Sequence, residues 1–177
     1  MMSMETSSLT EIANKTHDAS LNIRSIYLGS TGSEQLSRNK RFITPMNMSD
    51  VPKLFTSRRL PINVALIQVS PPDDFGWMSL GVSVDVTLAA ANAADFVIAQ
   101  VNSRMPRVMG HSFIHVNQVN VIVEHDEELP TISSLESSET AARIGKHISR
   151  LIEDGSTLQV GLDAASQATV QALEGKN

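Results

Sequence analysis

A serine between two turns is the first residue of the sequence that could act as a nucleophile. Residues 81–85 read Gly-Val-Ser-Val-Asp and precede an expected helix. A serine hydrolase needs Gly-x-Ser-x-Gly at such a place, because the second glycine permits the tight turn that exposes the hydroxyl group. Asp85 stands where that glycine is needed, so we expect that Ser83 instead caps a helix beginning near residue 84.

Three histidines and a nearby carboxylate are candidate metal ligands, namely His111, His115, His125 and Glu124. His111 and His115 have the spacing of one helical turn, but the residues around them have the pattern of an extended strand. In a strand two such histidines lie too far apart to share a metal ion, and no glutamate follows the first as it does in zinc peptidases. We therefore expect no metal site and no resident cofactor.

Two other clusters have ordinary interpretations. Residues 29–32 read Gly-Ser-Thr-Gly after an expected strand. Their amides could cradle a phosphate, but a turn at the end of a strand is the preferred interpretation. Carboxylates gather before Pro130, at Glu124, Asp126, Glu127 and Glu128. Nothing in their spacing places two of them across a cleft, so the cluster is typical of a solvated loop.

The elements that position these residues alternate between strand and helix. Residues 62–69 and 95–101 are nearly unbroken apolar runs, typical of strands that are buried on both faces. Shorter runs at residues 22–28, 120–124 and 157–160 complete the expected strands. Because strands that alternate with helices form βαβ units, the predicted fold class is α/β, with a mainly parallel sheet and flanking helices.

Helices are expected where capping residues and apolar periodicity coincide. Asp50 and Pro52 open a helix over residues 53–59, and residues 85–94 and 164–173 form two more.

A fourth helix follows the capping box that Ser133 and Glu136 form. It ends at Gly155, and its expected buried face consists of Ala141, Ile144, Ile148, Leu151 and Ile152.

The loop after the first long strand is the natural place for a pocket. In open α/β sheets, ligands bind beyond the carboxyl ends of the strands. Residues 70–81 follow the strand at residues 62–69 and contain Pro71, Pro72 and Gly76, so they form a loop at such an end.

The composition excludes several classes of function. The chain has 177 residues, of which 41% are hydrophobic, enough for the core of one domain. A net charge of −5 argues against binding to nucleic acid or anionic membranes, since both need clustered Lys and Arg. The sequence contains no cysteine, which excludes a catalytic thiol, and no apolar run long enough to span a bilayer. We expect a cytoplasmic protein.

A long stretch of the sequence resembles a known family. Residues 64–73, with Gly76, and residues 79–85 closely resemble the N-terminal domain of the acetyl-CoA hydrolase/transferase family, of the 4-hydroxybutyrate CoA-transferase type. The resemblance continues through residues 99–116 and 121–124, and less cleanly over residues 145–173. It implies a CoA-transferase (NagB/RpiA-like) fold, incomplete here. Residues 1–48 match poorly, and residues 49–177 are expected to form part of an N-terminal α/β domain.

The resemblance implies CoA transfer from an acyl-CoA to a small carboxylic acid, or hydrolysis of acetyl-CoA. In that family a glutamate attacks the acyl-CoA to form an acyl-glutamyl anhydride, and returning CoA gives a glutamyl-CoA thioester. A second acid then takes the CoA, while in the hydrolases water takes the acyl group. Backbone amides stabilise the oxyanion. The pocket residues that the resemblance implies are Gln68, Ser70, Gly81, Ser83, Asn102, Met105, Pro106, Gly110 and Gly161.

The sequence departs from the family's pattern in two places. The family's catalytic glutamate would fall after Asn177, so the resemblance implies no catalytic residue within the chain and no activity of the chain alone. The family's Gly-hydrophobic-Gly turn stands here as Gly-Leu-Asp at residues 161–163. Asp163 would place a negative charge beside the oxyanion; the alternative that Asp163 merely caps the following helix stays equally open.

Three interpretations of function remain. The chain could be a truncated part of a CoA-transferase, a complete half-enzyme that pairs with a separate chain bearing the glutamate, or a non-catalytic module that binds acyl-CoA or another subunit. Strands without enough helices to cover them predict a homodimer or pairing with the missing catalytic domain.

Overall fold

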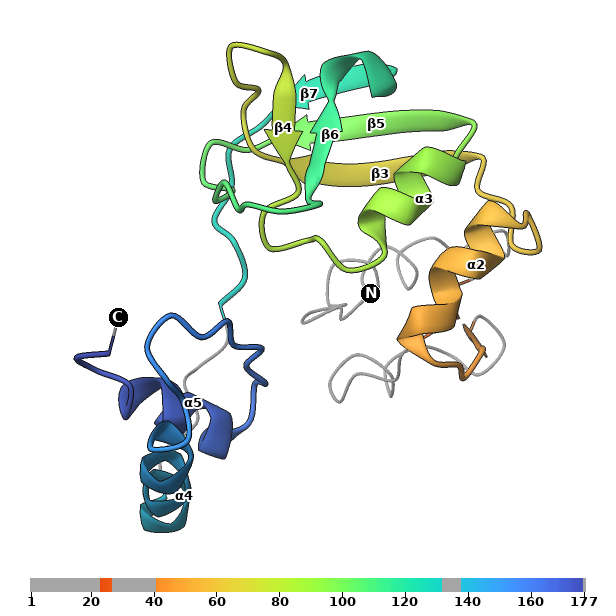
Figure 1. The fold of residues 1–177 in the computed structure, drawn as a ribbon. Coiled ribbons are helices and arrows are strands. Elements are labelled where there is room, and N and C mark those ends of the chain that lie inside the picture. The colour runs from red at the N-terminus through yellow and green to blue at the C-terminus, as the bar shows by residue number, and fades with distance from the viewer. Residues whose placement is uncertain (1–22, 27–40, 132–137, 177) are drawn as a thin grey trace. The chain divides into compact units, whose positions relative to one another are not determined.

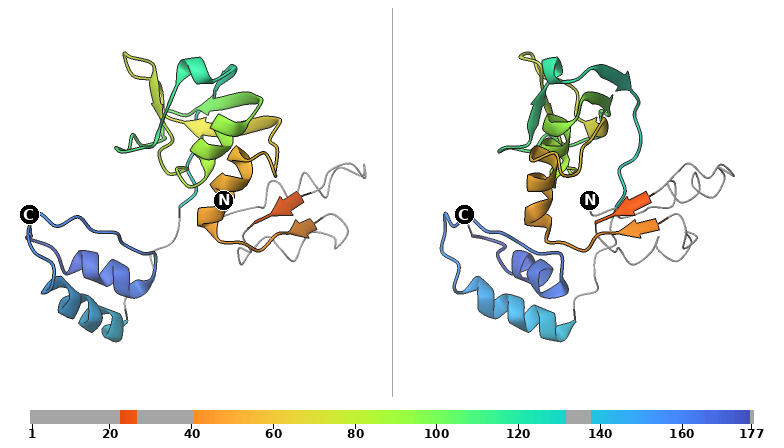
Figure 2. Two further views of the ribbon diagram at one scale, coloured as in Figure 1. Left: turned by 45° about the vertical axis from the view of Figure 1, so that its right-hand side comes forward. Right: turned by 90° about the vertical axis from the view of Figure 1, so that its right-hand side faces the viewer.

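The structure, a computed structural model, describes residues 23–26, 41–131 and 138–176 (Figures 1 and 2). The chain forms two compact units, residues 1–130 and residues 131–177. The described elements of the first unit are, in chain order, β1 (Ile23–Ser25), β2 (Arg41–Ile43), η1 (Met48–Asp50), α2 (Val51–Thr56), β3 (Val64–Val69), β4 (Trp77–Ser79), α3 (Thr87–Ala93), β5 (Phe96–Val101), β6 (Phe113–His115), η2 (Val116–Gln118) and β7 (Val121–Glu124). The second unit contains α4 (Glu139–Ser149) and α5 (Ala164–Gln171).

A three-stranded parallel sheet with the order β3-β5-β7 is the centre of the first unit (Figure 1). Val64 on β3 pairs with Phe96 on β5, and Ile98 on β5 pairs with Val121 on β7. β1 and β2 also pair in parallel, whereas β4 and β6 pair antiparallel. The structure therefore confirms the prediction of an α/β fold with a mainly parallel sheet. The expected loop at residues 29–32 lies outside the described residues.

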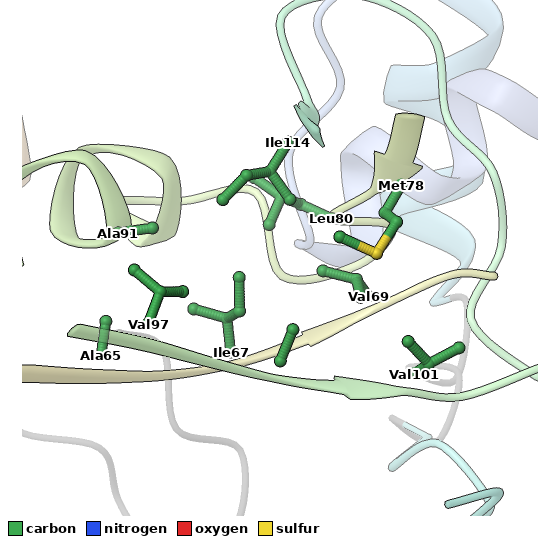
Figure 3. Close-up of a cluster of buried hydrophobic side chains, with 10 residues drawn as sticks. Ala65, Ile67, Val69, Met78, Leu80, Ala91, Val97, Val101 and Ile114 are labelled. Atoms are coloured by element: carbon green, nitrogen blue, oxygen red, sulfur yellow. The ribbon is translucent and has the colours of Figure 1, made fainter. Parts of the chain in front are cut away.

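One face of this sheet carries the hydrophobic core (Figure 3). Ala65, Ile67 and Val69 on β3 alternate with outward-facing residues, so that every second side chain reaches the core. Met78 of β4, Ile114 of β6 and Ala91 of α3 lie over them, together with Leu80, which directly follows β4. Val69, Met78 and Leu80 are fully buried. The antiparallel pair of β4 and β6 thus covers the core face of the sheet. β4 lies within residues 70–81, which the sequence assigned to a loop.

The opposite face of the sheet is open within the described part of the unit. Val64 is 51% exposed and Leu66 is 76% exposed, although both lie on β3. Phe96, Val121 and Val123 on the neighbouring strands are also exposed. The expectation that residues 62–69 and 95–101 are buried on both faces is therefore wrong for this unit. The alternation of exposed and buried residues is typical of a sheet with one covered face.

The two helices before the long strands start differently from the prediction. α2 begins at Val51 with Pro52 in its first turn, but the Asp50 carboxylate caps no backbone amide. It instead accepts a 2.9 Å hydrogen bond from Lys53 Nζ. α3 begins at Thr87 after Val86, without a side-chain cap. Ser83 is consequently not the cap of this helix, which corrects the interpretation made from its sequence neighbours.

The second unit consists of two packed helices. Ser138 caps α4, since its Oγ accepts a hydrogen bond from Ala141 N at 3.1 Å; the expected capping box at Ser133 and Glu136 lies outside the described residues. α4 ends at Ser149, before Gly155. Its buried residues are Ala141, Gly145 and Ser149. Of the face predicted to be buried, Ile144, Ile148 and Leu151 are exposed.

Two further expectations for this unit have different outcomes. Residues 157–160 were expected to form a strand but have no regular secondary structure. The last helix was expected over residues 164–173, and α5 is present over Ala164–Gln171. Among the helices of the described ranges, none combines the length and the apolar character needed to cross a membrane.

Candidate functional site

The ends of the parallel strands gather several of the predicted pocket residues. We call the carboxyl ends of β3, β5 and β7, with residues 70–81, 102–110 and 125–130 that follow them, the carboxyl edge. Gln68 lies near the end of β3, half-buried. Asn102 directly follows β5 and is fully buried, and its Nδ2 donates to Gln68 Oε1 across 3.4 Å. The structure therefore brings these two predicted residues together.

Ser70 belongs to a network of buried hydroxyl groups that orders the loop after β3. Ser70 Oγ accepts a hydrogen bond from Ser79 N at 2.9 Å, and Ser70 N donates to Ser79 O at 2.8 Å. Ser79, which is fully buried, uses its own Oγ to accept from Gly81 N and from Val108 N, each at 3.1 Å. One side chain thus connects the loop after β3 with the loop after β5.

Gly81 occupies a position that only glycine fits well. Its φ is +53°, in the left-handed region. A Cβ atom at this position would lie 2.3 Å from Met105 Sδ and 2.8 Å from Pro106 O. Met105 is buried, and its backbone amide donates to Asn102 O at 3.0 Å. Gly81, Met105 and Pro106, three predicted residues, are therefore in direct proximity.

Three predicted residues remain, namely Ser83, Gly110 and Gly161. Ser83 is half-buried in a turn, and its amide donates to Leu80 O at 2.9 Å. Gly110 has a φ of +98° but no neighbouring atom within 4 Å of an added Cβ. Gly161 belongs to the second unit. The prediction that these three line a common pocket stays a prediction.

Asp163, next to Gly161, caps α5. Its Oδ1 accepts hydrogen bonds from Ala165 N and Ser166 N at 3.0 Å each. The hydroxyl group of Ser166 donates to Oδ2 at 2.6 Å, and this bond, followed by those from the backbone, lowers the pKa of Asp163. Of the two alternatives left open by the sequence, the capping role is confirmed.

Asn102 fixes the segment after β7 to the end of β5. Its Nδ2 donates to Glu127 O at 2.9 Å, while its Oδ1 accepts from Arg104 N at 3.0 Å and from Glu127 N at 3.4 Å. Nearby, Asp126 Oδ1 accepts from Ser103 N at 2.6 Å, and this bond is the main reason why the pKa of Asp126 is lowered. The expected solvated acidic loop is therefore held by defined hydrogen bonds.

An ion pair joins the loop after β3 to the loop after β5. Arg107 Nη2 donates to Asp73 Oδ2 at 2.6 Å, and Arg107 Nη1 donates to Trp77 O at 3.0 Å. Asp73 Oδ1 also accepts from Trp77 N and Phe75 N, at 2.8 and 3.0 Å. The bond from Trp77 N is the largest cause of the lowered pKa of Asp73, and Arg107 adds to it.

Both ring nitrogens of His115 lie within hydrogen-bond distance of backbone atoms. His115 Nδ1 accepts from Asn117 N at 3.1 Å, and its Nε2 lies 2.9 Å from Phe75 O. Phe113–His115 form β6, as the extended pattern around them indicated. In the ranges that the structure describes, no group of three or more His, Asp and Glu side chains is arranged to hold a metal ion.

Sequence reasoning missed several residues of the carboxyl edge. Gln100 pairs with Gln68 across β3 and β5, and the Nε2 atoms of both donate to Glu127 Oε1, at 2.9 and 2.6 Å. A signal for this pair exists in the sequence, because each glutamine is the last but one residue of an apolar run. Ser79 and Arg107 have no comparable local signal, since their roles depend on pairing between distant segments.

The carboxyl edge is suited to binding a polar group rather than to covalent chemistry of its own. Its donors are side-chain amides, buried hydroxyl groups, backbone N–H groups and the guanidinium groups of Arg104 and Arg107. Among its carboxylates, Glu128 pairs with Arg104 at 2.7 Å and Asp126 accepts from the backbone. Glu127 accepts from the two glutamines. Each of these carboxylates is thus engaged within the described residues.

Comparison with known proteins identifies the family to which this chain is similar. Residues 5–133 match the acetyl-CoA hydrolase/transferase N-terminal domain, and this match contains the whole carboxyl edge. The chain is 41% identical over 151 residues to the 4-hydroxybutyrate coenzyme A transferase of Clostridium kluyveri, a match that covers 85% of this chain and 35% of that protein. It is 35% identical over 150 residues to the succinyl-CoA:acetate/propanoyl-CoA:succinate CoA transferase of Fasciola hepatica, covering 84% of this chain and 31% of that one.

A solved structure is similar as well. The crystal structure of 4-hydroxybutyrate CoA-transferase from Porphyromonas gingivalis superimposes with a TM-score of 0.72 at 34% identity, over 97% of this chain and 45% of that one. The chain spans about a third of the length of the curated relatives that it matches. Because the family model covers most of the chain, from residue 5 to residue 133, the protein belongs to the acetyl-CoA hydrolase/transferase family.

Proposed function

We propose that this chain supplies part of the acyl-CoA and carboxylate pocket of an enzyme that transfers CoA from an acyl-CoA to a small carboxylic acid, or that hydrolyses acetyl-CoA. The observation that carries the proposal is the match of residues 5–133 to the family's N-terminal domain, since it contains the ordered loops of the carboxyl edge. The names of the relatives, such as 4-hydroxybutyrate coenzyme A transferase, support transfer.

In the proposed role, the carboxyl edge orients the polar end of the substrate. Gln68 and Asn102 present side-chain amides, and Gly81 keeps the space beside Met105 free of a side chain. Ligands of parallel α/β sheets bind at this end of the strands. We assign the role to the part of the first unit that begins at residue 49, with Ser70, Ser83, Pro106 and Gly110 as further parts of the wall.

The proposed chemistry needs a glutamate nucleophile. A glutamate carboxylate attacks the thioester carbonyl and CoA leaves as a thiolate, forming an acyl-glutamyl anhydride. The thiolate then attacks the glutamyl carbonyl and releases the acyl group as its carboxylate, and the acceptor acid reverses both steps. Glu127 and Glu128 are engaged by amides and by Arg104. We therefore propose that the nucleophile comes from outside the 177 residues, and that this chain alone turns over no acyl-CoA.

We further propose that the chain works in the cytoplasm as part of a homodimer, or paired with a domain that bears the glutamate. The open face of the β3-β5-β7 sheet supports association, because an apolar surface of this kind is usually covered in a working protein.

A chimera tests the proposed function. Residues 50–130 replace the matching segment of the Clostridium kluyveri transferase, and transfer of CoA from acetyl-CoA to 4-hydroxybutyrate is measured against the unmodified enzyme. We expect the chimera to retain transfer and the isolated 177-residue chain to release no thiol from acetyl-CoA. A chimera that unfolds cooperatively like the parent enzyme but transfers no CoA contradicts the proposal.

A non-catalytic module that binds acyl-CoA or a subunit is the alternative. The open sheet face favours it equally, since that face suits an interaction surface. If the folded chimera is inactive while the isolated chain binds CoA in a calorimetric titration, the alternative replaces the proposal.

A further inference from the structure

Two glutamines on neighbouring strands bind the same oxygen atom. Gln68 on β3 and Gln100 on β5 are register partners near the carboxyl ends of their strands. Gln68 Nε2 donates to Glu127 Oε1 at 2.6 Å, and Gln100 Nε2 donates to the same atom at 2.9 Å. Both side chains stand on the face of the sheet opposite the core, because they alternate with the buried residues of their strands. The pair therefore forms a small site that holds a carboxylate.

The hydrogen-bond network fixes how this pair presents its donors. Gln68 Oε1 accepts from Asn102 Nδ2 at 3.4 Å, which leaves Nε2 of Gln68 directed at the carboxylate. Gln100 Nε2 also donates to His125 O at 3.1 Å, so one of its hydrogens is used by the backbone and the other by Glu127. The donors are thus held in place by groups other than the carboxylate that they bind.

The carboxylate is held in place mainly by neutral donors. Within the described residues, no Lys, Arg or His forms an ion pair with Glu127, whereas the adjacent Glu128 pairs with Arg104. Glu127 is exposed to solvent. Its backbone is held by Asn102 through the 2.9 Å bond to Glu127 O, so its side chain can rotate away without loss of the backbone position. A carboxylate from solution could then take its place at the same two amides.

We propose that the Gln68–Gln100 pair is a subsite for the carboxylate of a small organic acid, occupied in this structure by the chain's own Glu127. The proposal rests on the proposed function, for which it names the place where a carboxylate group binds. When the carboxylate of a free acid displaces that of Glu127, the charge-assisted hydrogen bonds from the two amides are replaced by equivalent ones. A tethered occupant that fills the site about nine-tenths of the time weakens the apparent affinity for a free acid on the order of tenfold.

Side-chain amide resonances test the proposal directly. The 177-residue chain labelled with 15N is titrated with sodium acetate at constant ionic strength, with sodium chloride as the reference salt, and the NH2 signals of Gln68 and Gln100 are followed. In Glu127→Ala we expect saturable shifts of both signals that chloride does not produce, with an apparent affinity about tenfold higher than in the unchanged chain. The matched control Glu128→Ala removes a neighbouring carboxylate that does not contact the amides, and should behave like the unchanged chain.

A second substitution tests whether acetate needs both glutamine amides. Gln68→Leu added to Glu127→Ala should abolish the saturable shift of Gln100. If Glu127→Ala does not fold, Glu127→Ser takes its place, since its short side chain cannot reach the two amides but keeps a polar group at this exposed position. The proposal is overturned if acetate produces no saturable shift, if Glu128→Ala behaves like Glu127→Ala, or if neither Glu127 variant folds, because Glu127 would then be a structural residue. None of these results affects the transfer activity of the chimera, so the two proposals fail separately.

Discussion

The side-chain amide of Asn102 donates a 2.9 Å hydrogen bond to the backbone carbonyl of Glu127 and joins the end of β5 to the segment after β7. The same side chain accepts from Arg104 N, and it is fully buried. A buried group that satisfies several backbone atoms is costly to remove, because each partner left without a hydrogen bond keeps its desolvation penalty.

Asn102→Leu should accordingly lower the free energy of unfolding by about 3 kcal/mol. Asn63→Leu is the matched control, since Asn63 is exposed and its side chain donates to the exposed Asp95, and it should cost less than about 1 kcal/mol. Urea denaturation followed by circular dichroism measures both values. Equal costs would mean that the Asn102 network contributes no more than a surface hydrogen bond.

Gly81 should tolerate no side chain, because an added Cβ meets Met105 and the backbone of Pro106. We expect Gly81→Ala to cost about 3 kcal/mol or more, and Gly81→Val to cost at least as much. Gly110→Ala separates the strain of a positive φ from the clash with neighbouring atoms. Gly110 also has a positive φ, but an added Cβ has no atom within 4 Å, so this variant should cost about 1 kcal/mol. Ser83→Ala should change stability by less than about 0.5 kcal/mol. Thermal unfolding compares the variants, and a Gly110→Ala shift as large as that of Gly81→Ala would remove the packing argument.

The Asp73–Arg107 pair predicts a dependence of stability on pH. The pKa of Asp73 is lowered from its ordinary value of 3.8, mainly by Trp77 N. A lowered pKa in the folded state stabilises the protein above pH 3.8, and this contribution is lost as the pH falls through the lowered pKa. Asp73→Asn should therefore lower the melting temperature at pH 7, with a difference from the unchanged chain that shrinks below pH 3.8. Asp74→Asn, at an exposed neighbour, is the control; a difference for Asp73→Asn that is independent of pH contradicts the assignment.

Gly145 lets α4 and α5 approach closely. An added Cβ would lie 2.5 Å from Ala168 C and 2.6 Å from Ala168 O, both backbone atoms that cannot yield locally. Gly145→Ala should thus destabilise the second unit by about 2 kcal/mol, although alanine is the better helix former by about 1 kcal/mol. Hydrogen exchange of the α4 amides measures the effect. Gly155→Ala, where an added Cβ has no neighbour within 4 Å but φ is +78°, should cost only about 1 kcal/mol.

The open face of the β3-β5-β7 sheet should drive association of the isolated chain. Sedimentation velocity at low micromolar concentration should show species larger than a monomer, and Leu66→Lys should shift them toward the monomer, because Leu66 is 76% exposed on that face. Met109→Lys is the matched control, at an exposed apolar residue outside the sheet. A single monomeric species of the unchanged chain would show that this face needs no partner.

The sequence was sufficient to predict the long strands, because a run such as residues 62–69 carries its own signal. It also located the carboxyl edge, since Pro71 and Pro72 prevent a strand or helix from continuing there. These features depend on residues that are neighbours in the sequence, so the sequence alone is enough to predict them.

The features that could not be predicted depend on contacts between distant segments. β4 pairs with β6 through Trp77 and His115, and neither strand has an apolar run of its own. Ile144 and Ile148 on α4 have a clear helical period, yet within the second unit they are exposed, because the period shows which residues share a face and not what covers that face. The register of Gln68 with Gln100 likewise exists only once β3 and β5 pair.

The hydroxyl group of Ser79 has a consequence for how a ligand would bind. By accepting from Gly81 N and Val108 N, it holds the loops after β3 and β5 in one conformation before any ligand arrives. Conformational entropy of these loops is already lost during folding, so association need not order them again. A ligand at the carboxyl edge would therefore meet loops that hydrogen bonds of the protein itself already hold.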